Sequence, residues 1–153
     1  MEIFLNNFKK EGDAFSETNI INILKDIIQV LSPVNTIADN FQIGISIVST
    51  KEIQKLNLEY RGKDQPTNVL SFGINCHPND NDPLLLGDIV LCKEIIEKEA
   101  KEYSKTYENR LKHMIIHGFL HLIGFNHDDN HERITMEEIE TQVMNNLSAG
   151  DPY

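Results

Sequence analysis

The stretch His113-Met-Ile-Ile-His-Gly-Phe-Leu-His-Leu-Ile-Gly-Phe-Asn-His127 organises this chain. It holds four of the six histidines, and most of the residues between them are apolar. A helix that is apolar on all faces is a buried helix, and a buried imidazole loses its hydration unless it gains a partner. The stretch therefore predicts a buried helix whose histidines do more than pack.

The spacing of three of these histidines indicates a metal site. His117 and His121 are four residues apart, so their side chains lie one turn above the other on the same side of a helix. Gly124 suits a left-handed helix end, which turns the chain and brings His127 towards the other two. Zinc binds imidazole in tetrahedral geometry, and three protein ligands leave one position for water. We therefore expect one Zn²⁺ on His117, His121, His127 and a water, rather than three core histidines bonded to backbone.

The other histidines have different expected roles. His113 lies one turn before His117, and we expect it to pack beside the site or to support a ligand from behind. His77 and His131 fall in polar stretches and are expected at the surface.

The same spacing occurs in the metzincin peptidases, whose pattern is H-E-x-x-H-x-x-G-x-x-H. Those enzymes use the glutamate after the first histidine to deprotonate the zinc-bound water. This chain has Gly118 at that position. A metzincin-like peptidase is therefore the weaker alternative, because peptide hydrolysis would need another carboxylate.

Composition favours one soluble domain over residues 1–153. Hydrophobic side chains make up 40% of the chain and charged ones 25%, as in ordinary globular proteins. Cys76 and Cys92 are far apart in sequence and are expected to be reduced thiols. With no basic and apolar signal at the start and no apolar run of roughly 20 residues, a cytoplasmic protein without a membrane partner is expected.

The net charge of −10 argues against a protein that coats nucleic acid through bulk electrostatics. A small basic groove is still compatible with that charge. Two groups of basic residues are interleaved with glutamate, which favours solvated helix faces of mixed charge. These groups are Lys51, Lys55, Arg61 and Lys63, and Lys98, Lys101, Lys105, Arg110 and Lys112.

Hydrophobic periodicity predicts about four strands and five helices. The strands are expected at 1–7, 41–48, 69–72 and 84–92, and the helices at about 16–31, 50–60, 93–103, 106–123 and 135–147. Leu58 is expected inside the second helix, and Ile134 on the buried side of the last one. The mixed order predicts a single-domain α+β fold, with one mixed four-stranded sheet packed with about five helices and the histidine helix buried.

Residues 117–127, H-G-F-L-H-L-I-G-F-N-H, resemble the signature of the YbeY endoribonucleases, H-G-x-L-H-L-x-G-Y-D-H. Phe125 and Asn126 depart from it, and neither is an expected ligand. Residues 56–72 are similar to the family's L-N-x-x-Y-R-x-x-D-x-P-T-[DN]-V-L-S-F-P, with Gly73 in place of the last proline. Residues 86–89 match L-G-D-I and residues 136–140 match M-E-x-x-E, so the resemblance runs from about 56 to 140.

The resemblance implies a zinc-dependent, single-strand-specific endoribonuclease that acts on rRNA. Family members are associated with maturation of the 16S rRNA 3′ end and with ribosome quality control. The implied zinc ligands match His117, His121 and His127, and the implied catalytic arginine matches Arg61. The implied partners are single-stranded rRNA and the small ribosomal subunit, with its proteins or an assembly GTPase.

Arg61 also makes chemical sense, because phosphodiester cleavage builds negative charge on oxygens that a guanidinium binds in a bidentate way. Thr67, Asn68 and Ser71 follow it and are expected to position Arg61 or the RNA. Asp88 has two open roles, as a carboxylate that orients a histidine or as a cap within the fold.

A second class of function remains open at this point, a non-catalytic ribosome-assembly factor whose zinc is structural. A fourth protein ligand such as Cys76 or Cys92 would favour that factor, whereas a water would favour the enzyme.

Overall fold

The computed structural model describes residues 1–32 and 39–153, which form one four-stranded sheet and five α-helices. The prediction of a single-domain α+β fold is confirmed. The strands are β1 (Glu2–Asn6), β2 (Phe41–Val48), β3 (Val69–Cys76) and β4 (Leu84–Cys92). The helices are α1 (Glu17–Leu31), α2 (Thr50–Arg61), α3 (Lys93–Glu102), α4 (Tyr107–Leu122) and α5 (Asn130–Asn146).

The sheet is mixed, and its strand order is β1-β2-β4-β3. β1, β2 and β4 run parallel, and β3 pairs with β4 in the antiparallel direction. β3 is therefore an edge strand. β2 alternates between buried and half-buried residues, as a strand with one face towards a core should.

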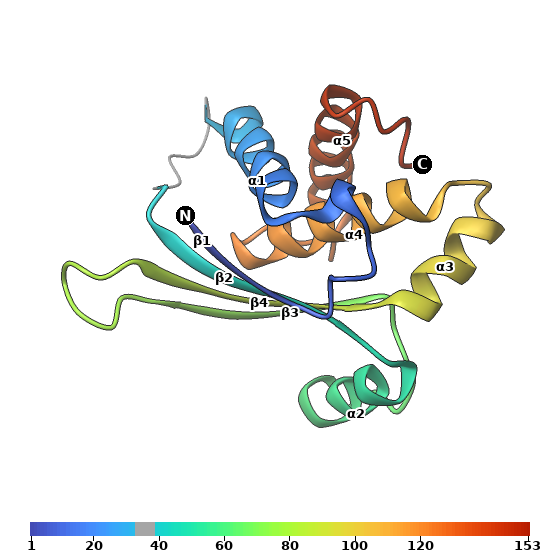
Figure 1. Ribbon diagram of the computed structural model, residues 1–153, viewed down its shortest axis with the longest axis horizontal. Coiled ribbons are helices and arrows are strands. Elements are labelled where there is room, and N and C mark those ends of the chain that lie inside the picture. The colour runs from blue at the N-terminus through green and yellow to red at the C-terminus, as the bar shows by residue number, and fades with distance from the viewer. Residues whose placement is uncertain (33–38) are drawn as a thin grey trace.

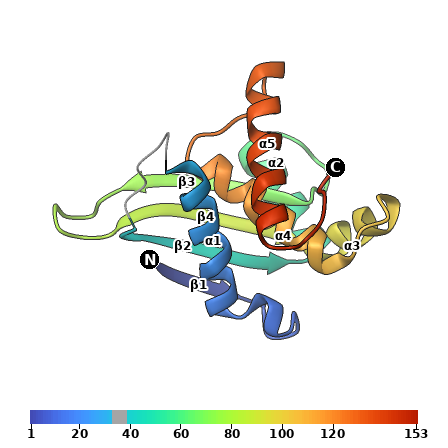
Figure 2. The ribbon, with the colours of Figure 1, turned by 90° about the horizontal axis from the view of Figure 1, so that it is seen from above.

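The helices cover the two faces of the sheet unequally. α1, α4 and α5 lie over one face, α2 lies under the other, and α3 continues beyond the strand ends (Figures 1 and 2). The main core fills the space between the sheet and the three helices. A small second cluster of Ile53, Leu70, Val90 and Cys92 joins α2 to the sheet.

The histidine helix α4 is buried, as predicted. It starts after Thr106, whose side chain accepts a hydrogen bond from the backbone N–H of Asn109 at 3.1 Å. It ends at Leu122, and Gly124 then adopts φ +102°, so the expected left-handed turn is confirmed. This turn redirects the chain towards α5 and places His127 beside the end of α4.

Several details differ from the sequence prediction. β3 continues to Cys76, because it pairs with β4 in a longer hairpin. α5 already begins at Asn130, because Asp129 accepts a hydrogen bond from the N–H of Glu132 at 2.8 Å. Leu58 is 49% exposed and Ile134 47% exposed, so both burial predictions are wrong. Each of these side chains lies on a helix that touches the body along one side only.

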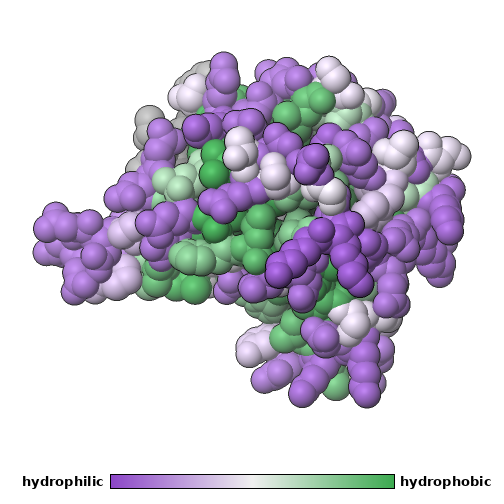
Figure 3. All heavy atoms as spheres, in the orientation of Figure 1, coloured by the Kyte–Doolittle hydropathy of each residue, from purple (hydrophilic) through white to green (hydrophobic). Residues whose placement is uncertain are grey.

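Hydrophilic and hydrophobic residues occupy different parts of the surface. Hydrophilic residues cover the tip of the β3–β4 hairpin and most of α2, while hydrophobic residues gather along the body between them (Figure 3). None of the helices in the described residues has the length and apolar character needed to cross a membrane.

Candidate metal centre

The three histidines chosen from their spacing come together at the end of α4. His117, His121 and His127 each offer a ring nitrogen, and these nitrogens lie within 4.8 Å of one another. The Nε2 atoms of His117 and His121 are 3.1 Å apart. Ligand nitrogens around a tetrahedral zinc, 2.0–2.1 Å from the ion, are about 3.3 Å apart. The donor set and its spacing therefore fit a zinc ion.

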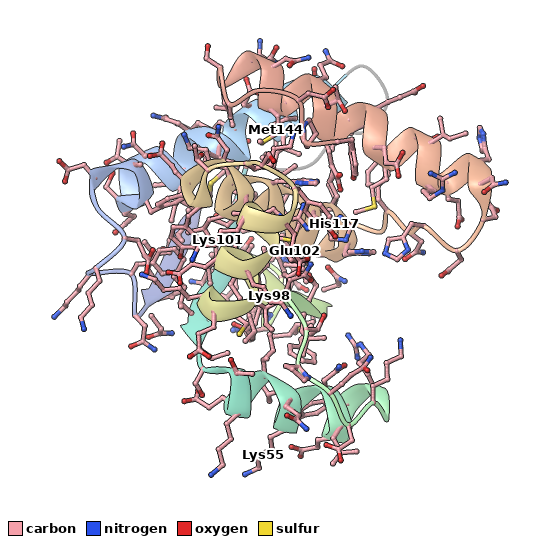
Figure 4. The ribbon with its side chains drawn as sticks, turned by 90° about the vertical axis from the view of Figure 1, so that its right-hand side faces the viewer. Lys55, Lys98, Lys101, Glu102, His117 and Met144 are labelled. Carbon is pink, nitrogen blue, oxygen red and sulfur yellow. The ribbon has the colours of Figure 1, made fainter. Side chains whose placement is uncertain are left out.

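The three rings also differ in exposure, which leaves one side of the centre open. His117 and His121 are half-buried on α4, and His127 is exposed in the loop after Gly124. Figure 4 shows His117 between α5 and α2. An ion held here would face the interior through His117 and solvent through His127, so a water or a substrate oxygen could reach it.

The residue that orients His117 is Glu140, which was not among the site residues predicted from the sequence. Its carboxylate is fully buried on α5, and its Oε1 accepts a hydrogen bond from Nδ1 of His117 at 2.6 Å. With Nδ1 engaged by Glu140, Nε2 is the ring nitrogen of His117 that faces His121, at 3.1 Å from its Nε2. A carboxylate behind a histidine is the usual support of a zinc ligand. The available signal was a glutamate in the buried stripe of α5, between Met136 and Val143.

Glu140 also holds two other side chains. Its Oε2 accepts a hydrogen bond from Nε2 of His113 at 2.7 Å and one from the Tyr153 hydroxyl. Arg110 lies behind His113, with its Nη1 3.1 Å from the ring Nδ1. Glu140 thus accepts from three side chains, and His113 groups with His117 and Glu140 rather than with the three converging imidazoles.

The protonation states suit metal binding. Burial alone raises the pKa of the Glu140 carboxyl, but hydrogen bonds and charge from His113 and His117 outweigh it and lower that pKa to about 2. Burial, aided by the two neighbouring imidazoles, lowers the pKa of His121 to about 4. At neutral pH Glu140 is thus ionised and His121 is neutral, as a metal ligand must be.

Gly118 explains why this helix differs from the peptidase pattern. A Cβ at Gly118 would lie 2.8 Å from Cγ2 of Ile89 and 3.2 Å from Oγ of Ser71. Any larger side chain here would collide with β3 and β4. The position that carries the catalytic glutamate in metzincins therefore faces the sheet in this protein and has no room for one.

The last turn of α2 brings Arg61 to β3, next to Ser71, which also lies close to Gly118 of α4. Gly62 caps that helix with φ +68°, and the buried Asn57 donates to the carbonyl of Gln65 at 2.8 Å to hold the next loop. The Arg61 guanidinium donates to the carbonyl of Ser71 at 2.8 Å. The Ser71 hydroxyl in turn donates to the carbonyl of Gly118 at 2.8 Å. Ser71 thus links the arginine to the residue beside His117.

The remaining candidates lie at different distances from this link. Asn68 donates to the carboxylate of Glu99 on α3 and accepts from the backbone N–H of Val69, so it fixes the start of β3. Thr67 is half-buried just before it. Asp88 is exposed and lies over Gly44, on the opposite sheet face from its neighbour Ile89, which contacts α4. The structure does not bring Asp88 to the histidines.

Comparison with known proteins identifies relatives over most of the chain. The family model described as Endoribonuclease YbeY matches residues 5–148. A curated Endoribonuclease YbeY from Buchnera aphidicola subsp. Schizaphis graminum (strain Sg) is 50% identical over 111 residues, which cover 72% of this chain and 70% of that protein. A solution structure of a Thermotoga maritima protein covers 96% of this chain and 92% of its own, with a TM-score of 0.56 and 23% identity. That last likeness concerns the fold alone.

Proposed function

Because the chain belongs to the YbeY endoribonuclease family, we propose that it is a zinc-dependent endoribonuclease that cuts single-stranded ribosomal RNA. Within that proposal its task is maturation of the 16S rRNA 3′ end and ribosome quality control. Its place of action is the cytoplasm, and its partner is the small ribosomal subunit with its proteins or an assembly GTPase.

One observation carries the metal-dependent part of this proposal. Three imidazole nitrogens converge within 4.8 Å, and Glu140 holds the first of these rings through its other nitrogen at 2.6 Å. Three histidines with an orienting carboxylate and one open position form the usual arrangement of a catalytic zinc. Zinc bound there would polarise a phosphoryl oxygen or lower the pKa of a water.

Arg61 supplies a positive charge for the phosphate of the RNA. Arg61 carries a guanidinium that is always protonated and that binds phosphate oxygens in a bidentate way. Its bond to the Ser71 carbonyl holds one end of the guanidinium, and Phe72 lies beneath it, with the ring centroid 5.1 Å from Cζ. A cation prepositioned in this way stabilises negative charge as it develops on the phosphate, without first having to be ordered.

The positions of the cysteines argue against a structural zinc. Cys92 is buried in the cluster under α2 and lies 3.7 Å from the Thr50 hydroxyl, and Cys76 is exposed at the end of β3. Within residues 1–32 and 39–153, neither thiol belongs to the histidine group. Three protein ligands favour the enzyme over a non-catalytic assembly factor.

Metal analysis combined with RNA cleavage tests the proposal. We expect about one zinc per chain in the wild type and cleavage of single-stranded but not of duplex rRNA fragments. His121→Ala should lose both the zinc and the cleavage. His77→Ala is the matched control, because His77 is exposed in the β3–β4 loop, where its ring contacts the carbonyl of Asp82. Full cleavage by zinc-free His121→Ala protein would overturn the proposal.

A further inference from the structure

Tyr60 is an aromatic side chain that the fold leaves exposed beside Arg61. It lies in the last turn of α2, and 56% of its surface is accessible. Its ring meets Phe72 of β3 edge to face, with 5.2 Å between the ring centroids and 63° between the ring planes. The ring is thus supported from one side and open to solvent.

This position follows from the geometry of α2. The helix turns Ile53, Leu56 and Asn57 towards the sheet, and Tyr60 comes three residues after Asn57 on the same side. At that point the sheet ends, because β3 is its edge strand. Tyr60 therefore projects over the edge of the sheet, where it meets Phe72 and stays exposed.

The surroundings of Tyr60 combine a flat apolar surface with a cation. Phe72 contacts both the Tyr60 ring and the Arg61 guanidinium. Ile74, two residues further along β3, is a second exposed apolar side chain, with 51% of its surface accessible. One nucleotide of an RNA strand presents the complementary pair of groups, a flat base for the aromatic ring and an anionic phosphate for the guanidinium.

We propose that Tyr60, supported by Phe72, stacks one base of the single-stranded RNA whose phosphate Arg61 binds. This inference rests on the proposed function and adds a residue that selects the substrate. Bases in a duplex are already stacked and paired, whereas an unpaired base can turn onto an aromatic ring. Stacking also supplies affinity that does not depend on charge, which suits a protein with a net charge of −10.

The test compares Tyr60→Ala and Tyr60→Phe with the wild type on a short single-stranded oligoribonucleotide that contains one 2-aminopurine. Phe4→Ala is the matched control, because Phe4 is 55% exposed on β1, at the opposite edge of the sheet from β3. Thermal unfolding of each variant checks that the fold is retained. The measurements are kcat, KM, the dissociation constant by anisotropy, and the quenching of 2-aminopurine fluorescence.

Tyr60→Ala should raise KM and the dissociation constant about five- to 100-fold, the loss expected for one stacked base, with kcat nearly unchanged. It should also abolish the quenching, whereas Tyr60→Phe and Phe4→Ala should behave like the wild type. Wild-type affinity and quenching in Tyr60→Ala would overturn the inference and leave the patch to a protein partner. Quenched binding without cleavage by the wild type would instead overturn the proposed function and support the stacking.

Discussion

The histidine centre and Arg61, the last residue of α2, lie on either side of Ser71, but they differ in how deeply their contacts are buried. His113 and His117 of α4 are backed by Glu140, which is fully buried and bonded through both carboxylate oxygens. Arg61 is exposed, and it is held by the backbone carbonyls of Ser71 and Tyr60 and by the ring of Phe72. The histidine centre is anchored in the core through Glu140, whereas Arg61 rests on the edge of the sheet.

This difference separates two kinds of consequence. Changes at the centre remove partners from buried polar groups, so they should reduce stability and metal binding together. Changes at Arg61 remove a charge that water already solvates, so they should reduce the reaction rate and leave both stability and metal content unchanged.

Glu140→Ala should have the largest effect. It leaves His113, His117 and the Tyr153 hydroxyl without their shared acceptor, and a buried donor left without its partner costs about 1–3 kcal/mol. The measurement is the free energy of unfolding in denaturant. Glu138→Ala, an exposed glutamate on the same helix, is the control. Equal stabilities of the two variants would contradict the role given to Glu140.

Arg61→Ala should lower kcat for RNA cleavage about 100- to 1,000-fold, the usual cost of losing one electrostatic donor to a transition state. Zinc content and thermal stability should match the wild type. Lys55→Ala is the control, because this cation lies on the same helix and points away from the sheet (Figure 4). Loss of zinc in Arg61→Ala would show that the two sites are not independent.

Gly118→Ala should destabilise the protein by about 1–3 kcal/mol, because the added methyl group overpacks α4 against Ile89 and Ser71. In an unobstructed helix the same substitution stabilises by about 1 kcal/mol. The sign of the change in the free energy of unfolding therefore shows whether the added methyl group collides with the sheet. Asn22→Ala, at an exposed position of α1, shows what an alanine does without the collision. A more stable Gly118→Ala protein would mean that the helix and sheet are further apart.

The smallest effect concerns pH in the metal-free protein. The pKa of His121 is about 4 in the fold and 6.5 as its ordinary value, so the unfolded chain takes up the proton first as the pH falls. Stability from this group is therefore constant above about pH 7 and decreases between 6.5 and 4. The free energy of unfolding, measured at several pH values in that range, should depend less on pH in His121→Gln than in the wild type. The same pH dependence in both proteins would contradict the lowered pKa of His121. The half-exposed ring keeps this effect modest.

The sequence was sufficient for the fold and for the three histidines because both depend on local periodicity. The alternation of apolar residues predicted β2. The four-residue spacing placed His117 and His121 on one side of α4, and Gly124 predicted the turn that brings His127 to the end of that helix. Pairing across the chain was harder to predict. Glu140 lies 23 residues after His117, and only the packing of α5 on α4 shows that the two meet.

Asp88 and Leu58 show the converse limit. Asp88 is a carboxylate of the right chemistry, but strand alternation turns it away from α4 because Ile89 takes the inward position. Leu58 is apolar and helical, yet α2 touches the sheet along one narrow side and leaves it exposed. For Asp88 the residue type suggested a role that its face of the strand rules out, and for Leu58 the periodicity did not reveal how far the neighbouring sheet extends.

The most direct test of a catalytic histidine centre is a count of the ligands around the bound metal. Zinc X-ray absorption on the loaded wild-type protein should show three imidazole nitrogens and one oxygen at about 2.0–2.1 Å. A sulfur at about 2.3 Å or a fourth imidazole would contradict the account, because the site would then be closed and structural.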